Sequence, residues 1–342
     1  MQNENDSSSG AVFVQTNEAE ANRVLAFRRA ADGQLSGVDS QLTGGRGDGV
    51  PHLTSQGSVV LTGDGRHLLI TNAGSDDLSL FAVDDEGLSL VATVATGGAA
   101  PKSVAERDGL VYVLNADVPS LAGFRLEGGS LQPLGEPRAL DAGADPAQVG
   151  FTPDGSGLVV TERGTNSIVL YPVNAEGRLG EPTVSPSSGP TPYGFAFAGN
   201  ALVVTEAFGA EAGKAAASSY VIQGKSATPV SRSIGNGRSE ICWAVVTKDG
   251  RYVFTTNFAD GAVSRYSIAD DGTLSLEDAV AAKAVEGQPG LRDEDLSKDG
   301  RFLYAIDADS GRIFGWSVDH GRLSALGSWA GVPATVAGLA AS

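Results

Sequence analysis

Residues 149–179 read VGFTPDGSGLVVTERGTNSIVLYPVNAEGRL, and this stretch is the clearest copy of a unit that organises the whole chain. It runs from a short apolar segment through Asp-Gly into a β-rich segment that ends in a polar residue, and then into a third segment and a second turn. Alternating apolar residues bounded by Asp-Gly or Glu-Gly are typical of antiparallel strands joined by tight turns. The stretch therefore predicts a unit of consecutive antiparallel strands.

The same unit recurs along the sequence. Related copies begin at Val59, Val104 and Ala244, and two more begin at Phe195 and Glu294. The polar residue that ends the second strand of each copy recurs about every 43 to 51 residues, which is the period of a β-propeller blade. The six aligned residues are Asn72, Asn115, Glu162, Glu206, Asn257 and Asp307.

A seventh unit is divided between the two ends of the chain. The N-terminal segment AVFVQTNEAEANRVLAFRRAADGQL places Asn17 in the same register but has no first strand, and the C-terminal PATVAGLAAS resembles a first strand with nothing after it. Joining residues 336–340 to residues 12–35 completes the unit and hides the sheet edges of an open ring. We therefore predict an all-β fold, a seven-bladed β-propeller whose N- and C-terminal strands close one blade. Residues 1–342 form one domain, with residues 1–10 as a disordered tail.

The composition of the chain argues against several classes of binding partner and site. The net charge of −17 opposes binding to nucleic acid or to an anionic membrane, because both require Lys and Arg against phosphate. The single cysteine, Cys242, excludes an internal disulfide and a cysteine-based zinc site. We expect a soluble monomer that takes a small-molecule substrate and no cofactor. The polar start of the chain fits a cytoplasmic protein or an exported one whose leader has been removed.

Two sets of residues should meet at one end of the central channel. The turn after the second strand and the loop that enters the innermost strand emerge on the same face of a propeller. The first set is the aligned polar series, in which Asn recurs as expected of turns, whereas Glu is a poor turn residue. Glu162 and Glu206 are therefore candidate catalytic residues, coupled as like charges with a raised pKa. The second set comprises Gln56, Lys102, Gln148, Tyr193, Trp243 and Arg292, with His52 as a possible base.

The blade pattern resembles the seven-bladed lactonase family that contains bacterial 6-phosphogluconolactonase and fungal carboxymuconate lactonizing enzyme. The resemblance covers essentially the whole chain. It implies binding and proton transfer by a His, two Arg and a Glu at the ends of neighbouring blades. Thr205-Glu206 matches the family pattern and places Glu206 at the position of its Glu.

The other family positions differ in this sequence. Pro146-Ala147 stands where the family has Pro-His, Pro192-Tyr193-Gly194 where it has Pro-Arg-His, and Asn257-Phe258 where it has Asn-Arg. Without those two guanidinium groups, a clamp for phosphate or carboxylate is harder to assemble. The resemblance thus implies a divergent branch of the family.

Two functions remain open from the sequence. One is a lactonase-like hydrolase or isomerase with Glu206, Glu162 and His52 in catalysis and with Tyr193, Trp243, Arg292, Gln148, Lys102, Asn257 and Asp307 contacting the substrate. The other is a non-catalytic propeller that binds a ligand or a protein. No metal-binding motif is present, although the oxygens of the aligned series are of the type that a divalent cation prefers.

Overall fold

The turn between the first and second strands of four repeats has the sequence Thr- or Ser-x-Asp-Gly. The hydroxyl group of the first residue donates to the aspartate, as Thr152 does to Asp154 at 2.7 Å. The glycine adopts a left-handed conformation, with φ of +73° at Gly155. Hydrogen bonds from Thr152 and Ser156 hold the pKa of Asp154 below its usual value. The repeated tetrapeptide thus fixes the hairpin that starts these blades.

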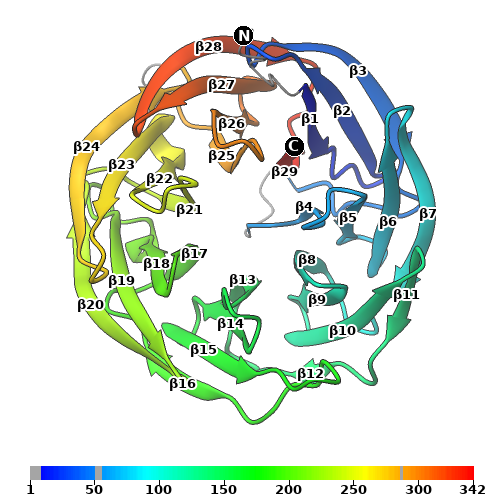
Figure 1. Cartoon of the computed structure of the whole chain (residues 1–342), viewed down its shortest axis with the longest axis horizontal. Helices are drawn as coiled ribbons and strands as arrows, with labels where there is room; N and C mark the ends of the chain where they lie inside the picture. Colours follow the sequence, from blue (N-terminus) through cyan, green and yellow to red (C-terminus); the bar gives the residue numbers. More distant parts are fainter. Residues whose placement is uncertain (1–8, 51–55, 286–287) are drawn as a thin grey trace, which may run out of the picture.

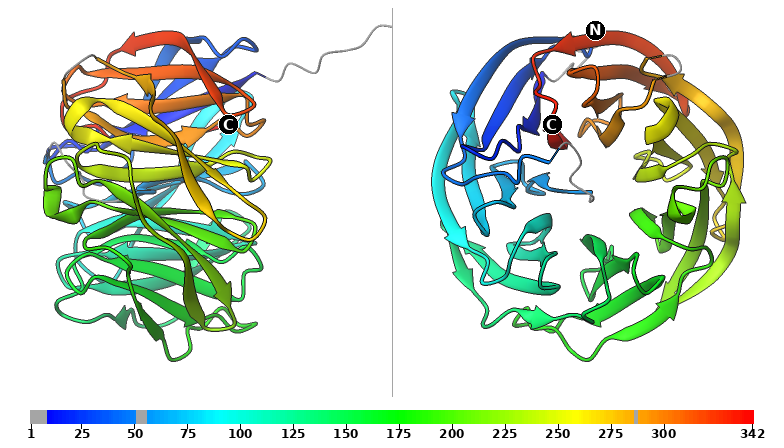
Figure 2. Two further views of the ribbon diagram at one scale, coloured as in Figure 1. Left: turned by 90° about the vertical axis from the view of Figure 1, so that its left-hand side faces the viewer. Right: turned by 180° about the vertical axis from the view of Figure 1, so that it is seen from behind.

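The computed structural model describes residues 9–50, 56–285 and 288–342. Its strands form seven antiparallel sheets that surround a central channel (Figure 1). The first strand of each sheet faces the channel and the fourth lies at the rim, and Figure 2 shows the ring from the side and from behind. The predicted seven-bladed β-propeller is confirmed.

The blades are described here by their strands, from the channel outward. Blade 1 contains β29 (Ala337–Ala341), β1 (Gly10–Gln15), β2 (Arg23–Arg29) and β3 (Leu35–Leu42). Blade 2 contains β4 (Val59–Leu61), β5 (His67–Asn72), β6 (Asp77–Asp84) and β7 (Gly87–Ala95). Blade 3 contains β8 (Pro101–Arg107), β9 (Leu110–Asn115), β10 (Ser120–Glu127), β11 (Ser130–Pro133) and the short β12 (Arg138–Ala139). Blade 4 contains β13 (Pro146–Phe151), β14 (Gly157–Glu162), β15 (Ser167–Pro172) and β16 (Thr183–Pro186).

The remaining three blades have the same order. Blade 5 contains β17 (Pro192–Ala198), β18 (Ala201–Glu206), β19 (Ala216–Gln223) and β20 (Ser226–Gly235). Blade 6 contains β21 (Ile241–Val246), β22 (Tyr252–Asn257), β23 (Ala262–Ile268) and β24 (Leu274–Lys283). Blade 7 contains β25 (Leu291–Leu296), β26 (Phe302–Asp307), β27 (Arg312–Asp319) and β28 (Arg322–Ala330). Two 3₁₀ turns, η1 (Phe208–Ala210) and η2 (Phe258–Asp260), follow β18 and β22.

The chain ends close blade 1 as predicted. β29 pairs antiparallel with β1, so that Leu339 lies opposite Val14 and Ala341 opposite Val12. The amide of Ser342 donates to the Ala11 carbonyl at 2.9 Å. The pairing gives both strands a partner and leaves no sheet edge at the junction.

The aligned residue of blade 1 is wrong. β1 ends at Gln15, so Asn17 lies beyond this strand and does not end it. The other six aligned residues each end a second strand as predicted.

The hydrophobic core lies between neighbouring blades. Leu69 and Leu80 of blade 2, for example, pack against Val104 and Val113 of blade 3. The second strand of a blade, such as β14, is therefore buried on both faces and reads as a nearly continuous apolar run, whereas outer strands such as β3 are mostly exposed. In the described part of the chain, no helix has the length and apolar character needed to span a membrane.

Candidate functional site at the channel entry

Six inner strands begin with a β-bulge at the entry to the channel. The ladder is interrupted after Pro101, Pro146, Pro192, Ile241, Leu291 and Ala337. A bulge aims a side chain out of the ladder and is common at functional sites. The equivalent residues after the break are Lys102, Ala147, Tyr193, Cys242, Arg292 and Gly338. Gln148 and Trp243 lie one position further along their strands than these residues.

Arg292 is the most distinctive group at this entry. Its side chain is 5% exposed, and its guanidinium carbon lies 4.9 Å from the centre of the Phe258 ring. Among the described residues, its Nε and Nη1 atoms have no hydrogen-bond partner. Burial lowers the pKa of Arg292, while Asp309 opposes that shift. A buried guanidinium with unused donors is a ready partner for a planar anion.

An aromatic pair lies beside this cation. Tyr193 and Trp243 are buried and pack edge to face, with ring centres 6.0 Å apart. The guanidinium carbon of Arg163 lies 5.0 Å from the centre of the Tyr193 ring, and Arg163 forms an ion pair with Asp145 at 2.6 Å. Sequence reasoning did not single out Asp145, because a lone aspartate in a loop carries no signal of an ion pair. Tyr193 therefore separates two guanidinium groups at the entry.

Lys102 adds a third cation that is nearly enclosed. It is 5% exposed, and burial, helped by the nearby Arg163, lowers its pKa to about 8. A lysine with such a pKa exists partly as a neutral amine near neutral pH and can accept a proton. Lys102, Arg163 and Arg292 bring three cationic side chains to this end of the channel, where Asp145 pairs with Arg163 and Asp309 lies near Arg292.

Two glutamines connect the inner strands to one another. The Gln148 amide donates to the Phe195 carbonyl at 3.1 Å and accepts from the Phe195 amide at 2.6 Å. Gln56 makes the same pair of bonds with Ala244, at 2.9 and 3.1 Å. The predicted location of Gln148 at the channel is confirmed, but its side-chain amide is engaged by the main chain. Its role in substrate binding stays a prediction.

Asn257 and Asp307 contact their own blades. The Asn257 amide donates to Ser264 at 2.9 Å, and its carbonyl oxygen accepts from Asn236 at 2.8 Å. One Asp307 oxygen accepts from both the amide and the hydroxyl group of Ser310, and the other has no partner among the described residues. Burial raises the pKa of Asp307. Asn257 therefore has the structural role expected of a strand-end asparagine, whereas Asp307 keeps one oxygen unused.

Glu206 does not point into the channel mouth. It is fully buried, and its carboxylate accepts hydrogen bonds from Ser218 on β19 at 2.6 Å and from Ser233 on β20 at 2.7 Å. The Gly189 amide donates to it at 2.8 Å. Because β19 and β20 lie outward of β18, the side chain is directed away from the channel, and the predicted orientation is wrong. A part in the chemistry stays a prediction.

Glu162 is buried at the end of β14. It accepts one hydrogen bond, from Thr165 at 2.6 Å. Its pKa is raised as predicted, but the causes are burial and the charge of Asp141, not Glu206. The two glutamates therefore do not form the coupled pair that the sequence predicted.

The remaining sequence predictions concern a base and a metal. His52 lies outside the described residues, so its predicted role as a base is not tested. Within the described residues, no group of three or more His, Cys, Asp or Glu side chains has an arrangement that could hold a metal ion. Some carboxylates and amides of the aligned series instead bond to nearby groups of their own and neighbouring blades, as Asn72 does to Ser79 and Thr43.

Comparisons with known proteins agree with this architecture. The family model described as "Lactonase, 7-bladed beta-propeller" matches residues 8–138, 130–207 and 205–332. No curated protein matches the sequence. A candidate 6-phosphogluconolactonase from Bacteroides fragilis has a similar structure, with a TM-score of 0.74, 19% identity and coverage of 99% of both chains.

A second solved structure is similar over nearly its whole length. It is the periplasmic gluconolactonase PpgL of Pseudomonas aeruginosa, with a TM-score of 0.71 and 19% identity over 96% of this chain and 97% of that chain. At such identities the structures share the fold, and their activities do not transfer.

Proposed function

Since the chain belongs to the lactonase family of seven-bladed β-propellers, we propose that it binds a small organic anion at the channel entry and acts on it as a hydrolase or isomerase. The substrate class is a lactone that carries an acidic group, or the hydroxy acid related to it. The observation that carries the proposal is the buried Arg292 with two unused nitrogen donors.

The entry supplies each part that such a substrate needs. Arg292 can donate charge-assisted hydrogen bonds to a carboxylate. Phe258, on which its guanidinium stacks, and Tyr193 offer apolar surface to the carbon skeleton. Lys102 stands at the equivalent bulge of blade 3 and, with a pKa of about 8, can accept a proton.

Lactone hydrolysis by these groups conserves atoms and charge. Lys102 takes a proton from water as the water oxygen bonds to the carbonyl carbon. The negative charge that develops on the carbonyl oxygen is stabilised by the nearby guanidinium groups. The bond to the ring oxygen then breaks, the ring oxygen takes up a proton, and a hydroxy acid is released.

A second candidate function is a propeller that binds such an anion without converting it. It is favoured by Ala147, Tyr193 and Phe258, which stand where the resemblance implies the family's His and Arg residues. The hydrogen bonds that hold Glu206 away from the channel favour it as well.

A lactone screen distinguishes the two candidates. Sugar lactones and simple aliphatic lactones are incubated with the protein, and acid release is followed with a pH indicator, with and without Ca²⁺ or Mg²⁺. We expect hydrolysis by the wild type and a loss of about 100-fold or more in Arg292→Gln. Arg322→Gln, an exposed arginine of β28, is the matched control and should retain activity. Uniform inactivity, with binding that still depends on Arg292, would support the non-catalytic propeller.

A further inference from the structure

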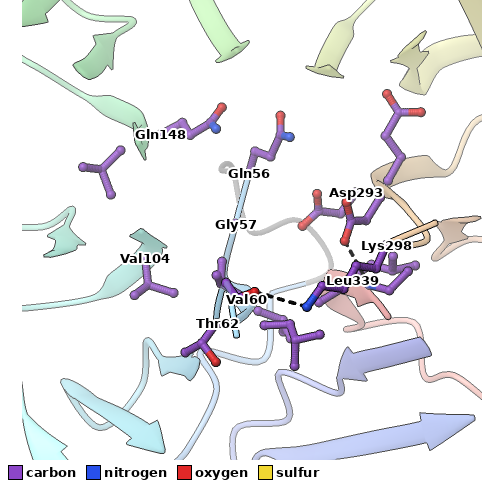
Figure 3. A pocket seen from close by; sticks show the side chains of 17 residues that line it. Gln56, Gly57, Val60, Thr62, Val104, Gln148, Asp293, Lys298 and Leu339 are labelled. Atoms are coloured by element: carbon purple, nitrogen blue, oxygen red, sulfur yellow. Dashed lines mark hydrogen bonds between the residues drawn. The ribbon is translucent and has the colours of Figure 1, made fainter. Parts of the chain in front are cut away.

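A cavity of about 400 Å³ lies along the inner strands beyond Gln56. Its walls come from β4, β8, β13, β25 and β29, and Figure 3 shows its lining side chains. The cavity extends to Thr62, Gly63 and Lys298, which belong to turns at the ends of inner strands. The residues of the proposed substrate site lie instead at the starts of inner strands. Of the described lining residues, none is Arg292, Tyr193 or Lys102. The cavity is thus separate from the proposed substrate site.

The polar feature of this cavity is the Asp293 carboxyl group. Asp293 is 2% exposed and lines the wall beside Leu339 (Figure 3). Main-chain groups of Leu339, Glu294 and Gly57 lie near it and lower its pKa, against the larger opposite effect of burial. Its Oδ2 atom has no hydrogen-bond partner among the described residues. A buried carboxyl oxygen without a partner is costly, and a ligand that donates to it would remove that cost.

Carboxyl groups dominate the polar lining of the cavity. Asp293, Glu294 and Asp295 are consecutive on β25 and all line it. Both oxygens of Glu294 also lack partners in the described part of the chain. Among the described lining residues, the one cation is Lys298, which is exposed and donates to the Gly63 carbonyl at 3.1 Å. Burial raises the pKa of all three carboxyl groups, and a ligand of positive charge would favour their ionised forms.

The rest of the lining is apolar. Val59, Val104, Val149 and Leu339 supply aliphatic side chains opposite and beside the carboxyl groups. Such walls favour the burial of an alkyl chain away from water, but they offer no hydrogen bonds to a polar group at the other end of the ligand. The combination is suited to a short molecule with one cationic group and an aliphatic stem.

We propose that this cavity binds a small organic cation, with an ammonium or guanidinium group against Asp293 and an alkyl stem between the valines. A metal ion fits less well, because the described His, Cys, Asp and Glu residues contain no group of three with metal-binding geometry. This proposal does not depend on lactone chemistry, so the experiment that tests it is separate from the test of the proposed function.

The test uses n-butylammonium as the probe and n-butanol as its neutral counterpart. Binding is measured at pH 7 and constant ionic strength by isothermal titration calorimetry. We expect butylammonium to bind and butanol to bind at least about tenfold more weakly, since a charge-assisted hydrogen bond separates them. Equal binding of the two, or no binding of butylammonium, overturns the proposal.

Two variants locate the site. Asp293→Asn should weaken butylammonium binding about tenfold or more, while Asp270→Asn, an exposed aspartate outside the cavity, should leave it unchanged. Val60→Phe adds an aromatic ring inside the cavity and leaves Asp293 unsubstituted, so it should abolish binding. Its control is Val184→Phe at an exposed position. If Asp293→Asn does not fold, the comparison of Val60→Phe with Val184→Phe tests the proposal instead. Unchanged affinity in Val60→Phe contradicts the proposal.

Discussion

The side-chain amide of Gln56, at the start of blade 2, forms two hydrogen bonds with the main chain of Ala244, on the inner strand of blade 6. The amide nitrogen donates to the Ala244 carbonyl at 2.9 Å, and the side-chain oxygen accepts from the Ala244 amide at 3.1 Å. The two residues belong to non-adjacent blades, so this contact connects inner strands on different sides of the channel. Gln56 also lines the cavity that contains Asp293.

Removing this contact should destabilise the protein. Gln56→Ala leaves the amide and carbonyl of Ala244 without their partner, and we expect the free energy of unfolding to fall by about 1–3 kcal/mol. Urea denaturation measures the change. Gln132→Ala, which truncates an exposed glutamine on β11, should change it by less than about 0.5 kcal/mol. Equal effects of the two substitutions would show that the bond across the channel contributes nothing.

Closure of blade 1 should control the stability of the whole ring. Deleting residues 335–342 removes β29 and exposes the edges of β1 and of the neighbouring inner strands, so the melting temperature should fall strongly. A circular permutant provides the control. It joins Ser342 to Gly10 by a short turn and opens the chain at Gly128–Gly129, which keeps every strand. The permutant should melt near the wild type, and a truncated protein with an unchanged melting temperature would contradict the closure.

Stability should decrease as the pH rises from about 4 to 7. Burial raises the pKa of Asp295 to about 7, and it raises those of Asp293 and Glu294 well above their usual range. A carboxyl group whose pKa is higher in the folded state contributes stability that is complete below the unfolded pKa and is lost as the pH rises through the folded value. For Asp295 the loss between pH 5 and pH 8 is on the order of 3 kcal/mol.

Asp295→Asn tests this dependence because its side chain cannot ionise. Urea denaturation at pH 5 and at pH 8 should show a smaller difference for the variant than for the wild type. The exposed Asp270→Asn should keep the wild-type difference. An identical pH dependence of all three proteins would refute the assignment to Asp295.

Glu206→Gln should act mainly on stability. The carboxylate accepts from Ser218, Ser233 and Gly189, and an amide nitrogen in its place would face donors instead of accepting from them. We expect the free energy of unfolding to fall by about 1–3 kcal/mol. Glu162→Gln is the comparison, since within the described ranges Glu162 accepts only from Thr165, and its effect should be smaller. If Glu206→Gln instead removed activity at unchanged stability, the carboxylate would belong to the chemistry.

The sequence predicted the fold well because each repeat contains its own turn signal and its own alternation. The closure of blade 1 by the two chain ends was predicted from the number of repeats, because the seventh unit is divided between the N- and C-termini. The end of the strand in blade 1 was missed because Asn17 resembles the other strand-end residues, although β1 ends at Gln15. The residue type alone does not show where the pairing of a strand stops.

The candidate site was predicted less completely. The entry bulges insert residues that no spacing in the sequence marks. The predicted entry set therefore combined bulged residues, such as Lys102 and Arg292, with Gln148 and Trp243, which lie one position further along their strands. Glu206 was assigned to the channel from the resemblance, but the serines on β19 and β20 hold it outward. The direction of a side chain depends on partners in other strands, which a single sequence does not specify.

The affinity of a sugar-acid anion for the wild type and for Arg292→Gln tests the central claim most directly. Gluconate is titrated into each protein in a calorimeter at pH 7, with Arg322→Gln as the control. If the buried Arg292 is the anion-binding group at the channel entry, the wild type and the control should bind gluconate, and Arg292→Gln should bind it at least about tenfold more weakly. Equal affinity of all three proteins, or no binding by the wild type, would contradict the account.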